Sequence, residues 1–195
     1  SIRSKDVRFI LNKIGSEKRK RYDYDLLEKE YTNLSSFEVD DTTFIKELKD
    51  QFIDKNVILL APGSSIKDNE ELVKQVKEEK SALVISTNFI HECSDYVFIS
   101  NVKRYDYWKN NPNFMNKKII ITSNISETPT EKEYVISLSR LIKCGWENMD
   151  NSSVLLLRLL DLLQVKEIFI AGLDGYNYVS NYLNGNLESN FPSKN

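Results

Sequence analysis

Residues 56–66 read NVILLAPGSSI, an apolar run that stops at a Pro-Gly-Ser-Ser turn and leads into a helix. Four consecutive apolar residues bounded by turn signals predict a strand that is buried on both faces. Gly63, Ser64 and Ser65 stand where this strand becomes a helix, and either serine can cap the helix. The unpaired N–H groups at a helix N-terminus favour an anion. Both a phosphate cradle and an ordinary capped turn fit this stretch.

The composition limits the function classes that the chain can serve. A chain of 195 residues predicts one domain plus an appendage. The net charge of −2 lacks the positive excess that is typical of nucleic-acid-binding proteins. Cys93 and Cys144 lack metal-ligand spacing, and we expect free thiols in a reducing compartment, although a disulfide between them stays open. No signal peptide is recognisable, and no apolar run approaches the ~20 residues of a membrane span. We therefore expect a cytoplasmic protein without a membrane or nucleic-acid partner.

The chain divides into residues 1–54 and residues 55–195. The first part predicts three short amphipathic helices, the third of them capped at Asp40-Asp41-Thr42-Thr43. We interpret these helices as an appendage to the domain that follows. The second part alternates strands with helices, which predicts a Rossmann-like, three-layer α/β domain with a mostly parallel sheet. The strands are expected at residues 56–60, 82–86, 96–99, 118–122, 134–138 and 167–171.

Small polar residues follow most of the predicted strands. In an open parallel sheet, ligands bind at the carboxyl edge, so these residues predict a site for a small molecule. Turns also favour Asn and Ser, which is the competing explanation. The polar residues at this edge are Ser64 and Ser65, Thr87 and Asn88, Ser100 and Asn101, Ser123 and Asn124, and Asp174. Ser152 and Ser153 open the last predicted helix and offer a second helix start.

Catalytic residues are harder to find in this sequence. His91 is the one histidine, and as a general base it would titrate near ~6.5. It has only the neighbouring Glu92 and Asp95 as acidic partners, which favours a loop histidine without a role. No cluster with metal-ligand spacing is present, and we expect no metal site.

Three segments resemble the C-terminal region of one group of bacterial proteins. The segments are residues 57–66 (VILLAPGSSI), 84–90 (VISTNFI) and 95–101 (DYVFISN), and residues 4–31 are similar to the stretch just after the catalytic barrel in that group. The group comprises aldolases similar to 4-hydroxy-2-oxovalerate aldolase and HMG-CoA lyase. The resemblance implies an accessory domain of a lyase-like parent, not itself an aldolase, because the barrel with its Asp-Arg-Glu motif is not in this chain. Residues 1–54 would then contact the barrel or a second copy.

A second, more distant resemblance concerns the loops at the carboxyl edge. The turn at residues 62–65, Asn88, the Ser152-Ser153 helix start and residues 172–176 are similar to a bacterial sialyltransferase family and to archaeal hydroxymethylpterin pyrophosphokinase-like proteins. In those families the corresponding loops hold a nucleotide, which implies a nucleotide or sugar-nucleotide ligand here. Pro and Gly are swapped in the turn, Ser153 replaces a glycine, and the histidine base of the transferases has no counterpart after Asp174.

These observations lead to one principal hypothesis and two alternatives. The principal hypothesis is a domain that binds a small phosphorylated ligand, a nucleotide or a sugar-nucleotide. Its expected contacts are phosphate at Gly63, Ser64 and Ser65, sugar or base at Asn88, further contacts at Ser100, Asn101, Ser152 and Ser153, and a ribose hydroxyl at Asp174. The alternatives are a nucleotide-sugar-dependent glycosyltransferase using His91, and a structural module that docks or oligomerises through residues 1–54.

Overall fold

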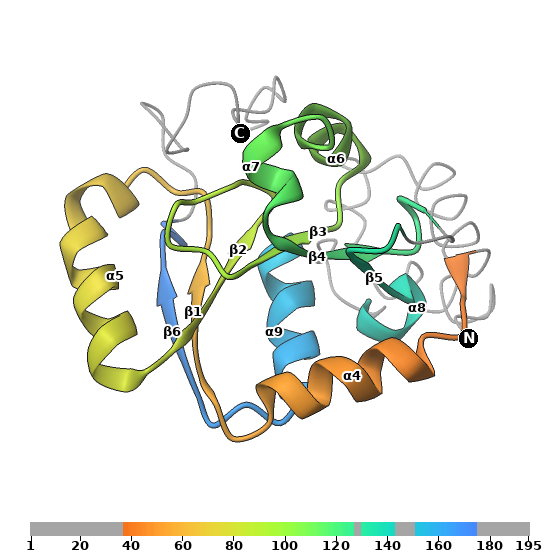
Figure 1. Ribbon diagram of the computed structural model, residues 1–195, viewed down its shortest axis with the longest axis horizontal. Coiled ribbons are helices and arrows are strands. Elements are labelled where there is room, and N and C mark those ends of the chain that lie inside the picture. Colours follow the sequence, from red (N-terminus) through yellow and green to blue (C-terminus); the bar gives the residue numbers. More distant parts are fainter. Residues whose placement is uncertain (1–36, 127–129, 143–150, 175–195) are drawn as a thin grey trace, which may run out of the picture.

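A six-stranded sheet forms the centre of the molecule (Figure 1). The computed structural model describes residues 37–126, 130–142 and 151–174. Every neighbouring pair of strands is parallel, in the order β5-β4-β3-β2-β1-β6. The strands are β1 (Asn56–Leu60), β2 (Leu83–Thr87), β3 (Tyr96–Ile99), β4 (Lys118–Thr122), β5 (Glu133–Ile136) and β6 (Glu167–Ala171). The predicted Rossmann-like α/β class is therefore confirmed.

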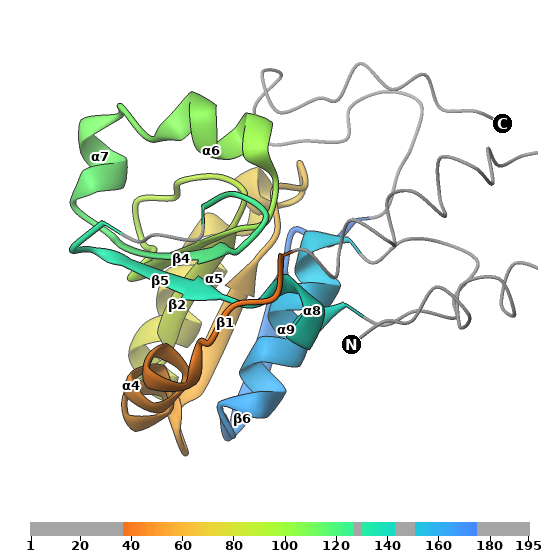
Figure 2. The same ribbon diagram turned by 90° about the vertical axis from the view of Figure 1, so that its right-hand side faces the viewer.

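Helices cover both faces of the sheet and make the three layers. Figure 2 shows α6 and α7 on one side and α4, α8 and α9 on the other. Val73 of α5 packs with Ile58 of β1 on the side of α6 and α7, and Leu156 of α9 packs with Val57 on the opposite side. The helices are α4 (Thr42–Phe52), α5 (Ile66–Lys80), α6 (Val102–Trp108), α7 (Pro112–Met115), α8 (Leu138–Leu141) and α9 (Ser152–Leu162). Successive side chains of β1 thus enter two different cores, as strand geometry requires.

Strands β2 and β5 differ by a residue or two from the predicted ranges. Strand β2 begins at Leu83 because the N–H of Ala82 donates to Lys77 O (2.9 Å) and so belongs to the end of α5. Ser81, in the left-handed conformation at φ 47°, closes that helix. Strand β5 ends at Ile136 because the N–H of Ser137 donates to the Asp41 carboxylate (2.9 Å) instead of to a neighbouring strand.

Helix α4 belongs to the core of the α/β domain, although the sequence assigned it to the appendage. Leu48 and Phe52 are fully buried in the same core as β1 and α9. The ring of Phe52 lies 4.7 Å from the ring of Tyr96 in β3, between centroids. The two earlier helices predicted for the appendage lie outside the described residues, as does Cys144. Cys93 is a free thiol.

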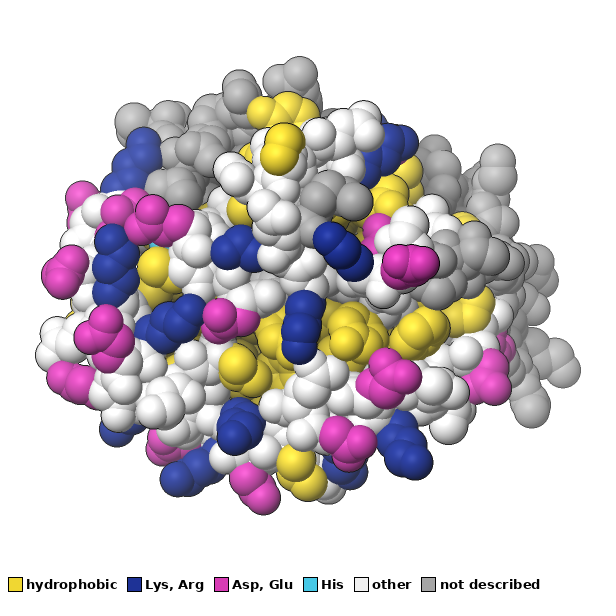
Figure 3. All heavy atoms as spheres, in the orientation of Figure 1, with side chains coloured by type: hydrophobic (Ala, Val, Ile, Leu, Met, Phe, Trp, Pro, Cys, Tyr) yellow, Lys and Arg dark blue, Asp and Glu magenta, His cyan; other side chains and the backbone are white. Residues whose placement is uncertain are grey.

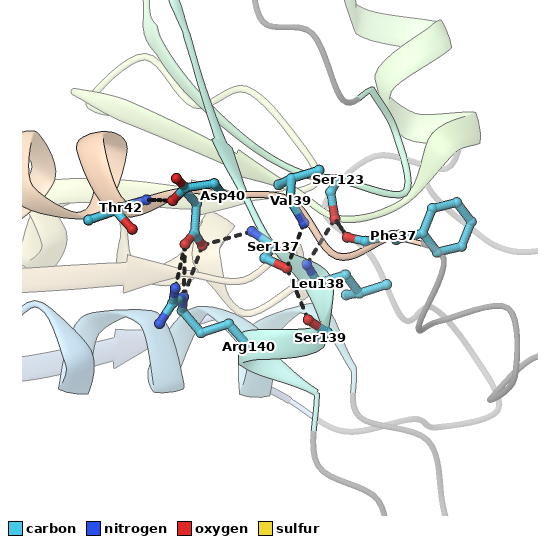
Figure 4. A network of polar contacts seen from close by, with 10 residues as sticks. Phe37, Val39, Asp40, Thr42, Ser123, Ser137, Leu138, Ser139 and Arg140 are labelled. Carbon is cyan, nitrogen blue, oxygen red and sulfur yellow. Dashed lines mark hydrogen bonds and ion pairs between the residues drawn. The ribbon is translucent and has the colours of Figure 1, made fainter. Parts of the chain in front are cut away.

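The segment 37–41 crosses the carboxyl ends of β4 and β5 (Figure 4). The Ser123 hydroxyl, just after β4, donates to the carbonyl of Phe37. The N–H of Val39 donates to the Ser137 hydroxyl at 3.3 Å. Asp41, which is fully buried, accepts hydrogen bonds from Arg140 at 2.6–3.0 Å. The segment Asp40-Asp41-Thr42-Thr43 was expected to cap α4. Asp40 accepts from the N–H of Thr42 at 3.1 Å, whereas the Asp41 side chain makes no cap bond and pairs with Arg140 instead. Ser123 is therefore engaged within the fold.

Candidate functional site

The carboxyl ends of the six parallel strands lie at one edge of the sheet. Strand β1 is flanked by β2 on one side and by β6 on the other, and α5 and α9 cover opposite faces of β1. The order of the strands therefore reverses next to β1, which is the position where open α/β sheets bind ligands. The structure brings the predicted edge residues together in two separate groups.

The first group, the Ser65–Asp174 pair, joins the turns that follow β1 and β6. The N–H of Ser65 donates to Asp174 Oδ2 at 2.8 Å, and the Ser65 hydroxyl donates to the other carboxylate oxygen. The two turns also meet through their backbones, since the N–H of Gly63 donates to Gly172 O at 2.9 Å. A Cβ on Gly63 would lie 2.3 Å from that oxygen, so only glycine permits this approach.

The Asp174 carboxylate therefore lies at the N-terminus of α5, where the sequence predicted a phosphate. A negative group at this end of a helix is stabilised by the helix dipole and by the first N–H groups. Ser65 is the residue before the helix, yet its side chain makes no cap bond to α5 and binds Asp174 instead. Ser64 is half-buried beside it, and its carbonyl accepts from the N–H of Lys67 at 3.2 Å.

The second group, the Asn88 cluster, comprises Asn88, Ser100, Asn124 and Ser152. Asn88 Nδ2 donates to Ser152 Oγ at 2.6 Å, and the N–H of Ser100 donates to Asn88 Oδ1 at 3.2 Å. The hydroxyl oxygens of Ser100 and Ser152 are 2.6 Å apart. Asn124 Nδ2 donates to the carbonyl of Ser100 at 3.2 Å. Three strand ends and one helix start thus contribute neutral donors and acceptors to one place.

The backbone around Asn88 explains why an asparagine occupies this position. Its φ of 63° lies in the left-handed region, which asparagine tolerates better than most residues. Its N–H donates to Phe98 O at 2.8 Å, and its carbonyl accepts from Trp108 Nε1 at 3.3 Å. These backbone bonds fix the residue and direct its amide toward Ser152.

The first turn of α9 lies beside this cluster. Asn151 caps the helix, because its side chain accepts from the N–H of Val154 at 3.0 Å. The N–H groups of Ser152 and Ser153 precede the first intrahelical bonds and have no acceptor within the helix. The Thr87 hydroxyl is buried on the α9 side of β2, the side that Ile85 faces, and it has no hydrogen-bond partner among the described residues. The site therefore retains hydrogen-bonding capacity for a polar ligand.

Two other predicted residues take different roles. Asn101 is exposed and caps α6, accepting from the N–H of Arg104 at 3.2 Å. His91 lies in the connection between β2 and β3, where its Nδ1 accepts from the N–H of Cys93 at 3.3 Å. Burial lowers the pKa of His91 below its ordinary value. Among the described residues, His91 contacts Cys93 and Phe89 of its own connection, and neither contact joins it to the Asn88 cluster.

The charges of the described residues do not gather into an ion site. Within the described ranges, no group of three His, Cys, Asp or Glu side chains is placed to hold a metal ion. Figure 3 shows both signs of charge interspersed over the face that it draws. No described helix combines the length and the apolarity needed to cross a bilayer.

The sheet order and the two groups at its edge define a Rossmann-like α/β domain with a polar site at the carboxyl ends of its central strands. Comparison of the chain with family models, with curated proteins and with solved structures found no match. The resemblances stated from the sequence therefore remain predictions. Three features escaped the sequence analysis: the Asp41–Arg140 pair, the Ser65–Asp174 pair and the contact of Trp108 with Asn88. Only the paired aspartates before α4 carried a signal, and it suggested a cap.

Proposed function

We propose that this domain binds a small phosphorylated ligand, a nucleotide or a sugar-nucleotide, at the Asn88 cluster. The observation that carries the proposal is the convergence of Asn88, Ser100 and Ser152 at the first turn of α9. Helix N-termini bind phosphate through free N–H groups and the helix dipole. Hydroxyl and amide side chains supply the neutral donors and acceptors that a sugar or a base edge needs.

The roles of the individual residues follow from their positions. The N–H groups and hydroxyls of Ser152 and Ser153 take the phosphate, and Asn88 and Ser100 take the sugar or base. The proposal places the phosphate at α9 and not at Gly63, Ser64 and Ser65, because the Asp174 carboxylate already accepts both donors of Ser65. A phosphate at α5 would meet a like charge there, which is unfavourable.

The resemblance to the aldolase-associated region suggests a setting for this binding. In that setting the domain is an accessory module that holds the ligand, and a separate barrel performs the chemistry. This part of the proposal rests on the resemblance alone.

A thermal-shift screen tests the proposal. The panel contains nucleoside mono- and diphosphates, sugar-nucleotides and sugar phosphates. A ligand at about one hundred times its Kd stabilises the folded state by about 2.7 kcal/mol, which raises the Tm by several degrees for a chain of this size at about 2–4 °C per kcal/mol. We expect a selective shift with one class of compound.

Two variants link the shift to the site. Ser152→Ala removes one hydroxyl, and Asn88→Gly removes the amide without straining the left-handed backbone. Each loses a hydrogen bond of about 0.5–1.5 kcal/mol, which raises the Kd about 2- to 12-fold. Asn110→Ala, at an exposed position, is the matched control and keeps the wild-type affinity. The proposal fails if no compound shifts the Tm, or if all three variants bind equally.

A further inference from the structure

A cavity of about 500 Å³ lies between the β2–β3 connection and the segment that contains α7. Its lining residues are mostly polar or aromatic, and they are His91, Trp108, Asn111, Asn113, Asn116 and Lys117, together with Ile90 and Glu92. The size falls within the ~300–1,000 Å³ of small-molecule sites. None of these residues belongs to the Asn88 cluster, although Trp108 Nε1 donates to Asn88 O at 3.3 Å.

The indole of Trp108 forms an apolar wall of the cavity. The Nε1–H of Trp108 already donates to Asn88 O, so the indole has no free donor for a ligand in the cavity. Ile90 adds further apolar surface beside it. A ligand here therefore needs an apolar face of its own to contact the indole.

The polar wall offers neutral groups. His91 accepts at Nδ1 from the N–H of Cys93, and so its proton lies on Nε2, which makes that atom a donor. Burial lowers the pKa of His91, which favours this neutral form. Asn111 uses its side-chain oxygen to cap α7 and retains its NH₂ donors. Within the described residues, the side chains of Asn113 and Asn116 make no hydrogen bond, so each offers both a donor and an acceptor.

The two charged groups at the cavity are matched by other partners. Lys117 Nζ donates to the carbonyls of Ser94 at 2.6 Å and of Glu92 at 3.0 Å. The Glu92 carboxylate lies 3.1 Å from Lys74 Nζ. A charged ligand would have to compete with these contacts, and a neutral one would not.

We propose that this cavity binds a neutral pyranose sugar. A pyranose combines an apolar C–H face, which packs on the Trp108 indole, with a rim of hydroxyls, which bond to the asparagine amides and to His91 Nε2. This inference goes beyond the proposed function, because it concerns a cavity lined by residues outside the Asn88 cluster and a ligand without phosphate.

Intrinsic fluorescence provides the test. The chain has two tryptophans, and Trp146→Phe leaves Trp108 as the sole emitter. This variant is titrated with the methyl α- and β-pyranosides of glucose, galactose, mannose and N-acetylglucosamine. We expect a saturable change of Trp108 emission with at least one of them. The same titration with the matching β-1,4-disaccharides distinguishes a free sugar from the end of a glycan, since a glycan site binds the disaccharide more tightly.

Two exposed positions supply the variants. Asn113→Ala and Asn116→Ala lie on the surface, so both keep the fold, and each is expected to raise the Kd by roughly two- to tenfold. Lys67→Ala, at an exposed position of α5, leaves the sugar affinity unchanged. The proposal is overturned if no pyranoside gives a saturable change, or if Asn113→Ala and Asn116→Ala both bind as tightly as the parent.

Discussion

Replacing Arg140 by alanine measures how much stability the fold loses when the buried carboxylate of Asp41 has no cation beside it. Asp41 is 0% exposed, whereas the side chain of Arg140 is 43% exposed. Arg140 donates through Nε to both Asp41 oxygens at 3.0 Å and through Nη2 to Oδ1 at 2.6 Å. The N–H of Ser137 is a further donor at 2.9 Å. Arg140→Ala therefore leaves the buried Asp41 carboxylate with the Ser137 N–H as its one remaining donor among the described residues.

The magnitude follows from the different exposure of the two partners. Breaking a buried pair and leaving a charge behind costs about 3–5 kcal/mol. Because water reaches the site of the Arg140 side chain, we expect the lower end of that range, about 3 kcal/mol, for Arg140→Ala. Asp41→Ala frees a guanidinium that water can hydrate and leaves one N–H unpaired, which costs about 1–3 kcal/mol. The double variant costs less than the sum of the two single variants.

Urea denaturation followed by circular dichroism measures these differences. Lys109→Ala is the control, because it breaks an ion pair with Asp106 (2.7 Å) whose two side chains are 44% and 56% exposed. An exposed pair of this kind is worth about 0–1 kcal/mol. The reasoning is refuted if Arg140→Ala destabilises the domain no more than Lys109→Ala, or if the two single variants add without coupling.

Three further perturbations probe other parts of the fold. Gly172→Ala places a Cβ 2.1 Å from Ala61 O at a backbone φ of 73°. We expect the free energy of unfolding, measured in urea, to fall by at least about 2 kcal/mol. An unchanged free energy of unfolding would contradict the close approach of the turns that follow β1 and β6. Burial lowers the pKa of His91 below 6.5, so the unfolded chain binds the proton more readily and stability falls as the pH drops below that value. His91→Asn should flatten this slope as the pH falls below about 6.5, and an unchanged slope would exclude His91 as its source. Burial and the hydrogen bond to Glu133 raise the pKa of Tyr105 to about 12, so its contribution is present below the ordinary value of ~10 and is lost as the pH rises toward 12. In that window the Tyr105→Phe variant should lose less stability than the wild-type protein. Identical alkaline denaturation curves for the two proteins would count against the Tyr105–Glu133 hydrogen bond.

The sequence predicted the layers of the fold because their signals are local. The apolar run of β1 and the turn after it identify a buried strand followed by a helix, and apolar runs that end at turn residues also mark β2, β4 and β6. The place of α4 was not predictable in this way. Leu48 and Phe52 show helical spacing, but that spacing does not reveal whether the covered surface belongs to this sheet or to another part of the chain.

The candidate site shows the same limit. The polar residues after the strands could be found one by one, since strand ends are recognisable. Their grouping depends on strand order, which brings residues 88, 100 and 152 into contact and pairs residue 65 with residue 174. Contacts between residues that are 64 or 109 positions apart leave no periodic trace in a single sequence. Ser123 looked equivalent to Asn124, but the hydroxyl of Ser123 binds the segment that precedes α4.

Amide chemical-shift mapping of the ¹⁵N-labelled protein tests the central claim, that a phosphorylated ligand binds at the first turn of α9. The titrant is the nucleotide or sugar-nucleotide that gives the largest thermal shift, or UDP and CDP if all shifts are small. We predict saturable changes that are largest at the amides of Asn88, Ser100, Ser152 and Ser153. Changes confined to Ser65 and Asn69 at α5, or no saturable change at any amide, would contradict the account.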